Sequence, residues 1–367
     1  MLEKPWYRSF NWPLALLTVT VAVCGVIVIH SADLRDAAAA AEWKRQIAYV
    51  AAGVFVMALF AAIDYRRWQR WALRLYVLNL VLLAIVMRGG HSALGAQRWI
   101  ALGPLGTFQP SEPAKLILAI VVAALLCRAA VVGWREMCIV IAAVLVPAVL
   151  ILKQPDIGTA LVVFAILTVQ LFFGLSQMGL FGLYAAASAA VGAFVVGTKY
   201  VLKPFQRNRL LVFLHPNDDL QGIGWNLHQS KIAVGSGELF GKGLYKGTQT
   251  QLNFVPEHSR DFIFTVVGEE LGYVGAVSLV LAYALILVGC ARAMIVARDR
   301  FGFLLAAGLT TMIAFHVVVN IGMTIGIMPI TGIPLPFLSY GGSAILTDFA
   351  AIGILLNIDL QRDKMEF

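Results

Sequence analysis

The stretch WPLALLTVTVAVCGVIVIHS, residues 12–31, runs for 20 positions without an acidic residue, a lysine or an arginine. At a rise of about 1.5 Å per residue, a helix of this length crosses the apolar core of a bilayer. The stretch is longer than the apolar core of a signal peptide and has no clear small-residue cleavage site. It therefore predicts an uncleaved membrane anchor.

The composition of the whole chain agrees with this first stretch. Of the 367 residues, 60% are hydrophobic and 13% are charged, and the charged share is about half that of soluble globular proteins. The mean hydropathy is +0.83. A soluble protein of this size could not bury so much apolar surface. We therefore expect an all-α polytopic membrane protein that forms a single integral membrane domain over residues 1–367.

Apolar runs similar to the first one recur along the chain and predict ten transmembrane helices. The expected ranges are 12–31, 46–63, 72–87, 111–128, 138–152, 157–174, 178–197, 262–291, 302–326 and 341–358. One long loop, 198–260, separates the seventh helix from the eighth. Because the number of spans is even, both termini are expected on the same side of the membrane.

The distribution of lysine and arginine predicts which side that is. The termini and the loops 64–74, 128–137 and 292–301 carry 13 such residues, whereas the short loops on the opposite side carry six. Positive charge in short loops is retained on the cytoplasmic side. We therefore expect both termini in the cytoplasm and the 198–260 loop outside.

The external loop is basic, with eight lysines and arginines against four acidic residues. It is glycine-rich and amphipathic from Gln229 to Gly247. A solvated basic loop is one interpretation. We favour a surface that lies on the outer leaflet and binds an anionic headgroup. The expected partners are therefore the membrane and its lipids, and no nucleic acid.

Charged side chains within apolar spans are costly and mark candidate functional residues. Glu112 and Lys115 are three positions apart, which places them on one face of a helix. They form either a structural ion pair or part of a binding cavity. Asp156 opens the sixth predicted helix, where it either caps the amide of Thr159 or contributes its carboxylate to a site.

Asp261 is the last polar residue before the eighth predicted helix, which places its carboxylate at the outer membrane boundary. A carboxylate in that position is a candidate general base toward a sugar hydroxyl. The alternative is a helix N-cap. The Pro- and Gly-rich run 331–343 lies between two spans, and such irregular backbone persists at membrane depth only where it is buried in protein or lines a wet cavity. We expect this run to form a wall beside the site.

Seven segments along the chain carry recognisable motifs. They are Gly95–Trp99, Phe108–Lys115, Gln154–Thr159, Gln229–Gly237, Gly247–Leu252, Val255–Phe264 and Gly332–Ser343. Together they resemble the SEDS family (shape, elongation, division and sporulation proteins), and within it the elongation protein RodA more than the division paralogue FtsW. The resemblance covers nearly the whole chain, and the motifs stand in the family's order.

This resemblance implies a ten-helix peptidoglycan glycosyltransferase that polymerises lipid II on the outer face of the bacterial cytoplasmic (inner) membrane. It implies a class B penicillin-binding protein as the partner that cross-links the strands. The family's essential acid falls on Asp261, its cavity pair on Glu112 and Lys115, and a further carboxylate on Asp156. Arg260 stands where the family usually has threonine.

On this hypothesis Asp261 takes a proton from the acceptor hydroxyl as that oxygen attacks an undecaprenyl-pyrophosphate-linked sugar. Cations are needed to neutralise the leaving pyrophosphate. The remaining expected substrate contacts are Lys115, Arg98, Arg209, Lys231 and Ser236. A divalent ion, Mg²⁺ or Mn²⁺, held by Asp261 and substrate phosphates is left open. Two other functions are also left open, namely a flippase for the lipid-linked precursor and a non-catalytic scaffold for the penicillin-binding protein.

Overall fold

The computed structural model describes residues 10–32, 41–89, 91–93, 96–101, 103, 106–198, 209, 212–213, 223–252, 254–255 and 258–363. Within these residues it contains ten helices of 16 residues or more, one for each predicted span. They are α2 (Trp12–Ala32), α3 (Glu42–Ala62), α4 (Tyr65–Gly89), α5 (Ser111–Leu126), α6 (Trp134–Lys153), α7 (Ile157–Gly174), α8 (Met178–Gly197), α12 (Ile263–Ile295), α13 (Arg300–Ile325) and α14 (Gly342–Leu360). Nine of the ten are long and apolar enough to cross a membrane, and the tenth, α5, has 16 residues. The predicted fold class is confirmed.

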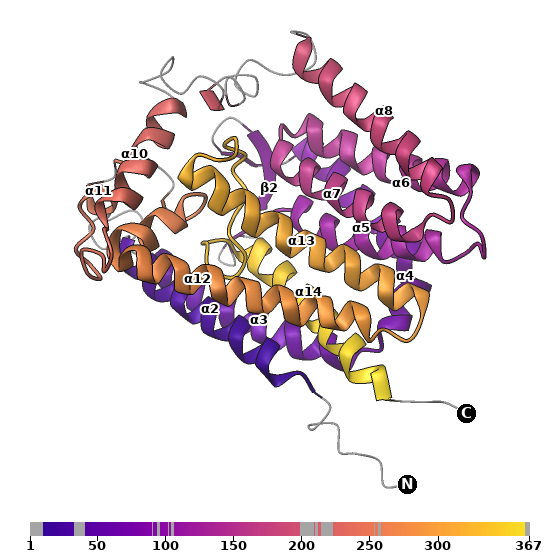
Figure 1. The fold of residues 1–367 in the computed structure, drawn as a ribbon, viewed down its shortest axis with the longest axis horizontal. Helices are drawn as coiled ribbons and strands as arrows, with labels where there is room; N and C mark the ends of the chain where they lie inside the picture. Colours follow the sequence, from indigo (N-terminus) through magenta and orange to yellow (C-terminus); the bar gives the residue numbers. More distant parts are fainter. Residues whose placement is uncertain are drawn as a thin grey trace, which may run out of the picture.

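Helices α5, α13 and α14 form the centre of the bundle, because most of their residues are buried. Helix α14 lies along α3, and α13 lies along both α12 and α7 (Figure 1). Small residues permit the closest approach. A Cβ at Gly353 of α14 would lie 2.5 Å from the Met57 carbonyl oxygen of α3. Helix α8 lies at the edge of the bundle against α7, with Tyr184 as its one buried residue (Figure 1).

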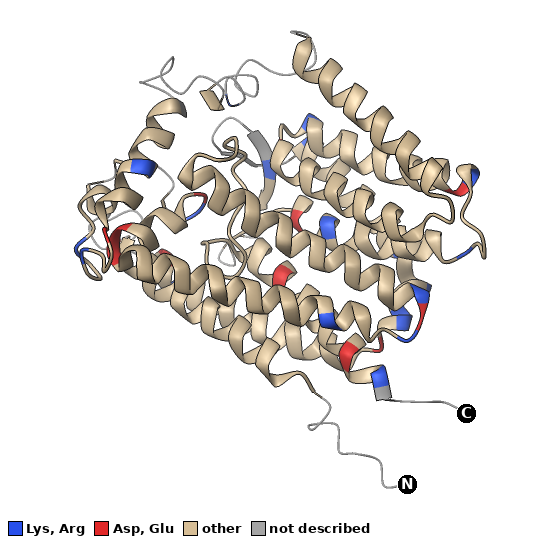
Figure 2. Ribbon diagram, in the orientation of Figure 1, with Lys and Arg blue, Asp and Glu red and all other residues tan. Residues whose placement is uncertain are grey.

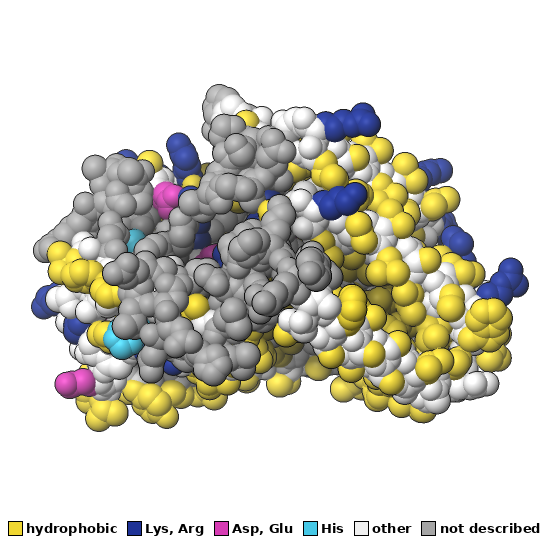
Figure 3. Space-filling view, turned by 90° about the horizontal axis from the view of Figure 1, so that it is seen from above, with side chains coloured by type: hydrophobic (Ala, Val, Ile, Leu, Met, Phe, Trp, Pro, Cys, Tyr) yellow, Lys and Arg dark blue, Asp and Glu magenta, His cyan; other side chains and the backbone are white. Residues whose placement is uncertain are grey.

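The outer faces of the helices carry the apolar side chains that a bilayer requires. Large hydrophobic residues such as Phe55, Leu73 and Phe194 are more than 60% exposed. In Figure 3, hydrophobic side chains cover much of the described surface in the right half of the view, and most of the lysines and arginines there stand near its upper and right edge.

The predicted span 262–291 is broken near its start, because Gly272 of α12 has non-helical φ and ψ angles of 66° and −163°. Two further features differ from the sequence-based expectation. Helix α4 begins at Tyr65 rather than at 72, so most of the predicted 64–74 loop is helical. The Asp64 carboxylate accepts a hydrogen bond from the Arg66 backbone amide at 2.9 Å, and the Tyr65 amide donates to Asn357 at 2.8 Å. The arginines that follow lower the hydropathy, but arginine is a good helix former. The helix therefore starts before the apolar run.

The second difference is a small antiparallel sheet that the all-α expectation missed. Its strands are β1 (His91–Ala93), β2 (Ala96–Ala101) and β3 (Thr107–Phe108), in the order β1-β2-β3. Strands of two to six residues are too short to give a readable alternation of apolar and polar positions. Pairing of Ile100 with Phe108 brings the sheet to the start of α5.

The segments predicted to be cytoplasmic meet at one end of the bundle. Arg66 of α4 forms an ion pair of 3.3 Å with Asp299, and Arg300 donates to the Gly174 carbonyl at the end of α7 at 2.7 Å. The start of α2 and the end of α14 lie at this same end (Figures 1 and 2). The loops therefore group as the charge count predicts, and the assignment of this end to the cytoplasm stays a prediction.

Candidate functional site

Asp261 lies in the turn that leads into α12. It is beside Gly332, which follows the end of α13, whereas Asp299 is the N-cap of that helix, so the two lie at opposite ends of the bundle. The helix N-cap is Phe262, and its side chain makes no capping hydrogen bond. The alternative in which Asp261 is the N-cap residue is therefore not what the structure shows. Asp261 is partly exposed, whereas Phe262 and Ile263 after it are buried. Its carboxylate thus stands where the partly exposed turn meets the buried helix, and its place at the outer membrane boundary stays a prediction.

The backbone of this turn is held at every residue. Each carbonyl oxygen from residue 259 to residue 262 accepts a hydrogen bond, the first three from residues that are distant in the sequence. In chain order the donors are the Tyr340 amide at 2.9 Å, Ser339 Oγ at 2.6 Å, the Asn320 side-chain amide at 2.8 Å and Thr265 Oγ1 at 2.6 Å. Two of these donors belong to the Gly332–Ser343 run. The predicted wall beside the site is therefore also what fixes the turn.

Gly332 lies directly against the Asp261 carboxylate. A Cβ built on Gly332 would lie 3.0 Å from Asp261 Oδ2 and 3.4 Å from Arg209 Nη1. The φ angle of Gly332 is 71°, a conformation that favours glycine. Arg209 also donates to the Thr331 carbonyl at 3.0 Å. Because Gly332 has no side chain, the Asp261 carboxylate and the Arg209 guanidinium can both lie against this backbone segment.

Arg209 carries the cationic charge of this site. Burial lowers the pKa of its guanidinium, and the negative charges of Asp261 and Asp156 act in the opposite direction. Arg98 adds a second positive charge nearby. Of the expected substrate cations, the structure therefore brings Arg209 and Arg98 into the electrostatic surroundings of Asp261 and Asp156.

Asp156 has a structural role at the start of α7. It is the N-cap of α7, where Oδ1 accepts from the Thr159 amide at 3.1 Å. Its Oδ2 accepts from Ser111 at 3.1 Å and from Gln109 at 3.2 Å, which joins the start of α7 to the start of α5. Arg98 lies 4.0 Å away and donates to the carbonyls of residues 154 and 155. The capping interpretation is confirmed, and the substrate-binding role of Asp156 stays a prediction.

Glu112 and Lys115 form the predicted pair on one face of α5. Lys115 Nζ lies 2.8 Å from Glu112 Oε2, and both side chains are buried. The same Nζ lies 3.0 Å from His316 Nε2 on α13. Asp348 of α14 is buried within electrostatic reach of both partners and accepts a hydrogen bond from the Phe337 backbone. The pair is therefore part of a larger cluster that joins three central helices to the Gly332–Ser343 run.

Sequence reasoning missed His316, Asp348, Asn320 and Ser339. Asp348 carried a usable signal, because it is a charged residue inside a predicted apolar span. Asn320 and Ser339 carried none, since both act through backbone carbonyls that are distant in the sequence.

Lys231 and Ser236 lie on α10 (Ile223–Ser236), which packs against α12 and α13. The Lys231 side chain is exposed and lies against Gly326 at the end of α13. The Ser236 hydroxyl donates to the Ala233 carbonyl within its own helix at 2.9 Å. Both residues therefore lie on a helix at the end of α13 that is opposite Asp299, and their external location and their contact with substrate stay predictions.

The described part of the external loop is tied to α12 rather than solvated as a whole. Glu269 is fully buried and accepts from Lys242 at 2.7 Å and from Thr250 Oγ1 at 2.8 Å. Glu270 accepts from Ser31 Oγ at 2.7 Å. Helices α10 and α11 (Thr248–Gln251) accordingly lie beside the start of α12 (Figure 1). Phe240 nevertheless is 80% exposed, which is compatible with the expected outer-leaflet surface.

The described residues offer few protein ligands for a divalent ion. Within the described ranges, no three His, Cys, Asp or Glu side chains come together in a metal-binding group. Such an ion would be held by Asp261 together with oxygens of substrate phosphates, which are ligands that Mg²⁺ accepts. The residues present do not form a cage of their own, and we derive no step through an ion.

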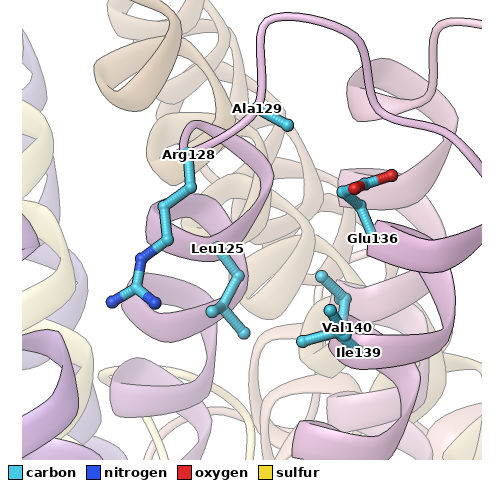
Figure 4. A pocket seen from close by; sticks show the side chains of 6 residues that line it. All are labelled: Leu125, Arg128, Ala129, Glu136, Ile139 and Val140. Carbon is cyan, nitrogen blue, oxygen red and sulfur yellow. The ribbon is translucent and has the colours of Figure 1, made fainter.

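A pocket of about 280 Å³ lies away from this site, between the end of α5 and α6. It is lined by Leu125, Arg128, Ala129, Glu136, Ile139 and Val140. In Figure 4 the Arg128 guanidinium points away from Glu136. The pocket is at the Asp299 end of the bundle, because Arg300 donates to the Ala129 carbonyl. We do not assign it to the chemistry of Asp261.

The sequence matches a family model described as "Cell cycle protein" and named for FtsW, RodA and SpoVE, over residues 12–364. This chain belongs to the FtsW/RodA/SpoVE family. Among curated members of the family, it is 38% identical over 353 residues to the peptidoglycan glycosyltransferase MrdB of Escherichia coli, with 95% of this chain and 93% of the relative covered. It is 37% identical over 374 residues to a probable peptidoglycan glycosyltransferase FtsW of Trichlorobacter lovleyi, with 98% and 95% covered.

Solved structures of the family share the fold. A chain from work on the coordination of polymerization and crosslinking by a peptidoglycan synthase complex superposes with a TM-score of 0.81 at 30% identity, covering 97% of this chain and 99% of that one. The rod shape determining protein RodA of Thermus thermophilus superposes with a TM-score of 0.71 at 30% identity, covering 98% and 100%. Membership of the family, expected from the seven motifs, is confirmed. The near-equal identities to MrdB and FtsW do not separate elongation from division.

Proposed function

We propose that this chain is a peptidoglycan glycosyltransferase that polymerises lipid II into glycan strands on the outer face of the cytoplasmic membrane during cell elongation. The names of its relatives support the enzyme class. The observation that carries the site is the Asp261 carboxylate, held against Gly332 by a fully bonded turn with Arg209 beside the same glycine. The elongation role rests on the motif resemblance to RodA.

Asp261 acts as the general base in this proposal. Its carboxylate accepts the proton of the acceptor sugar hydroxyl, and the oxygen forms a bond to the anomeric carbon of the donor. The bond from that carbon to the pyrophosphate oxygen breaks, and the lipid pyrophosphate leaves with the electron pair. Arg209 neutralises the charge that develops on the leaving group, as a cation fixed before the reaction does most effectively.

The partner and the orientation complete the proposal. A class B penicillin-binding protein cross-links the strands that this chain makes, and a relative by structure belongs to a peptidoglycan synthase complex. Both termini face the cytoplasm, so that Asp261, at the opposite end of the bundle, faces the periplasm or exterior. The basic charge of the external loop supports binding of anionic lipid headgroups on that side.

The decisive experiment is glycan synthesis from purified lipid II by the detergent-purified chain, alone and with its transpeptidase partner. Asp261→Asn should abolish polymer formation without loss of expression. Asp64→Asn is a matched control, because Asp64 is also partly buried and lies in a helix-initiating turn at the other end of the bundle. Near-normal polymer from Asp261→Asn would refute the assignment. Addition of EDTA and then Mg²⁺ in the same assay decides whether an ion takes part.

The two other functions give different outcomes. A flippase would move lipid-linked precursor across liposome membranes and make no polymer in the absence of another polymerase. A scaffold would support polymer formation only when a second enzyme is present, and Asp261→Asn would leave that support intact.

A further inference from the structure

Asn320 connects two pieces of backbone at the candidate site. It lies near the end of α13 and is fully buried. Its side-chain nitrogen lies 2.8 Å from the Asp261 carbonyl oxygen and 2.7 Å from the Ile333 carbonyl oxygen. A primary amide has two N–H donors, so each proton has one acceptor. One side chain therefore joins the turn of Asp261 to the run that contains Gly332.

The orientation of the Asn320 amide follows from its neighbours. Both atoms facing the nitrogen are carbonyl oxygens, which can only accept. An amide turned by 180° would place its own oxygen against them. Its Oδ1 has no hydrogen-bond partner within the described part of the chain, which also indicates that the donor side of the amide is the side in use.

The two carbonyls belong to the backbone segments that carry the base and that hold the cation. Asp261 Oδ2 faces Gly332, and Arg209 is held by the carbonyl of Thr331, the residue before that glycine. If the two backbone segments moved apart, the carboxylate and the guanidinium would separate with them. The region is buried, so water does not readily replace a lost donor.

We propose that Asn320 is a positioning residue for glycosyl transfer, which fixes the Asp261 carboxylate relative to Gly332 and Arg209. This inference rests on the proposed function of Asp261. Reactions between oriented groups are sensitive to misplacement, and a shift of about 1 Å can cost roughly 100-fold in rate. Asn320 itself touches no reacting atom, so its loss should affect the rate of the chemical step more than substrate binding.

The test is the pair of variants Asn320→Leu and Asn357→Leu, assayed for lipid II polymerisation and for thermal unfolding. Leucine keeps the branched shape of asparagine and removes both donors. Asn357 is a matched control: it is buried, donates to the Ala61 carbonyl at 2.7 Å, and lies at the opposite end of the bundle. Both variants should unfold at lower temperature. Only Asn320→Leu should lose about 10- to 100-fold in kcat with KM nearly unchanged.

A second variant keeps the test decisive if Asn320→Leu does not fold. Asn320→Ser retains one hydroxyl donor, and we expect it to fold with kcat between those of the wild-type chain and the leucine variant. Wild-type kcat in a folded Asn320→Leu or in Asn320→Ser would overturn the inference, as would an equal loss of kcat in Asn357→Leu. Asp261→Asn in the same assay separates the two proposals: if it stays active, the proposed function is wrong, and if it is inactive while Asn320→Leu is normal, only the positioning role is wrong.

Discussion

Lys115 Nζ lies 2.8 Å from Glu112 Oε2 inside the helix bundle, and the lysine is the more deeply buried of the two, with 1% of its side chain exposed. Neither charge has bulk water nearby to stabilise it alone. The pair thus depends on its own geometry and on the neighbouring His316 and Asp348. This dependence has a measurable consequence for folding.

Lys115→Met should destabilise the protein by about 3–5 kcal/mol, because it leaves a buried carboxylate without its cation. The double variant Glu112→Gln with Lys115→Met should recover part of that loss, since it removes both charges. The control is Arg66→Met at the partly exposed Arg66–Asp299 pair, where we expect a change of about 0–1 kcal/mol. Unfolding in detergent measures all three. Equal losses at the two pairs would show that burial does not govern the Lys115 pair.

The Glu112–Lys115 pair also illustrates what the sequence could predict. A spacing of three residues and a charge in an apolar span are local signals, and so is the position of Asp261 before a long apolar helix. The ten spans follow from equally local hydropathy. These features needed no knowledge of which segments meet in space.

The features that sequence reasoning missed depend on long-range contacts. Asn320 and Ser339 donate to the turn of Asp261, although they are 59 and 79 positions away from their acceptors in the sequence. Arg209 was one of several candidate cations, and its contacts with the Thr331 carbonyl and with Gly332, beside Asp261, distinguish it from Lys231. Asp348 is different, because a charge in an apolar run is a signal that the sequence itself contains.

Gly237 provides a test of how the external loop is held on α12. A Cβ on Gly237 would lie 2.0 Å from the Gly268 carbonyl oxygen, so the loop must move away from the helix in Gly237→Ala. We expect a loss of about 1–3 kcal/mol, as for other overpacked contacts, and faster proteolysis between residues 237 and 251. Gly235→Ala is the control, because nothing lies within 4 Å of the corresponding Cβ. Helix α10 should tolerate that alanine or gain from it. Similar proteolysis of both variants would mean that the close contact does not hold the loop.

The direction of the chain in the membrane decides whether Asp261 can meet lipid II outside the cell. In a background without the four native cysteines, Lys246→Cys should react with a membrane-impermeant maleimide added to intact spheroplasts. Gln177→Cys should react only after lysis, because Gln177 follows α7 at the end where Arg300 contacts Gly174. Both positions are exposed, so that failure to react reports the barrier and not burial. The reverse labelling pattern would place Asp261 on the cytoplasmic side, and polymerisation at the outer face by this carboxylate would then be ruled out.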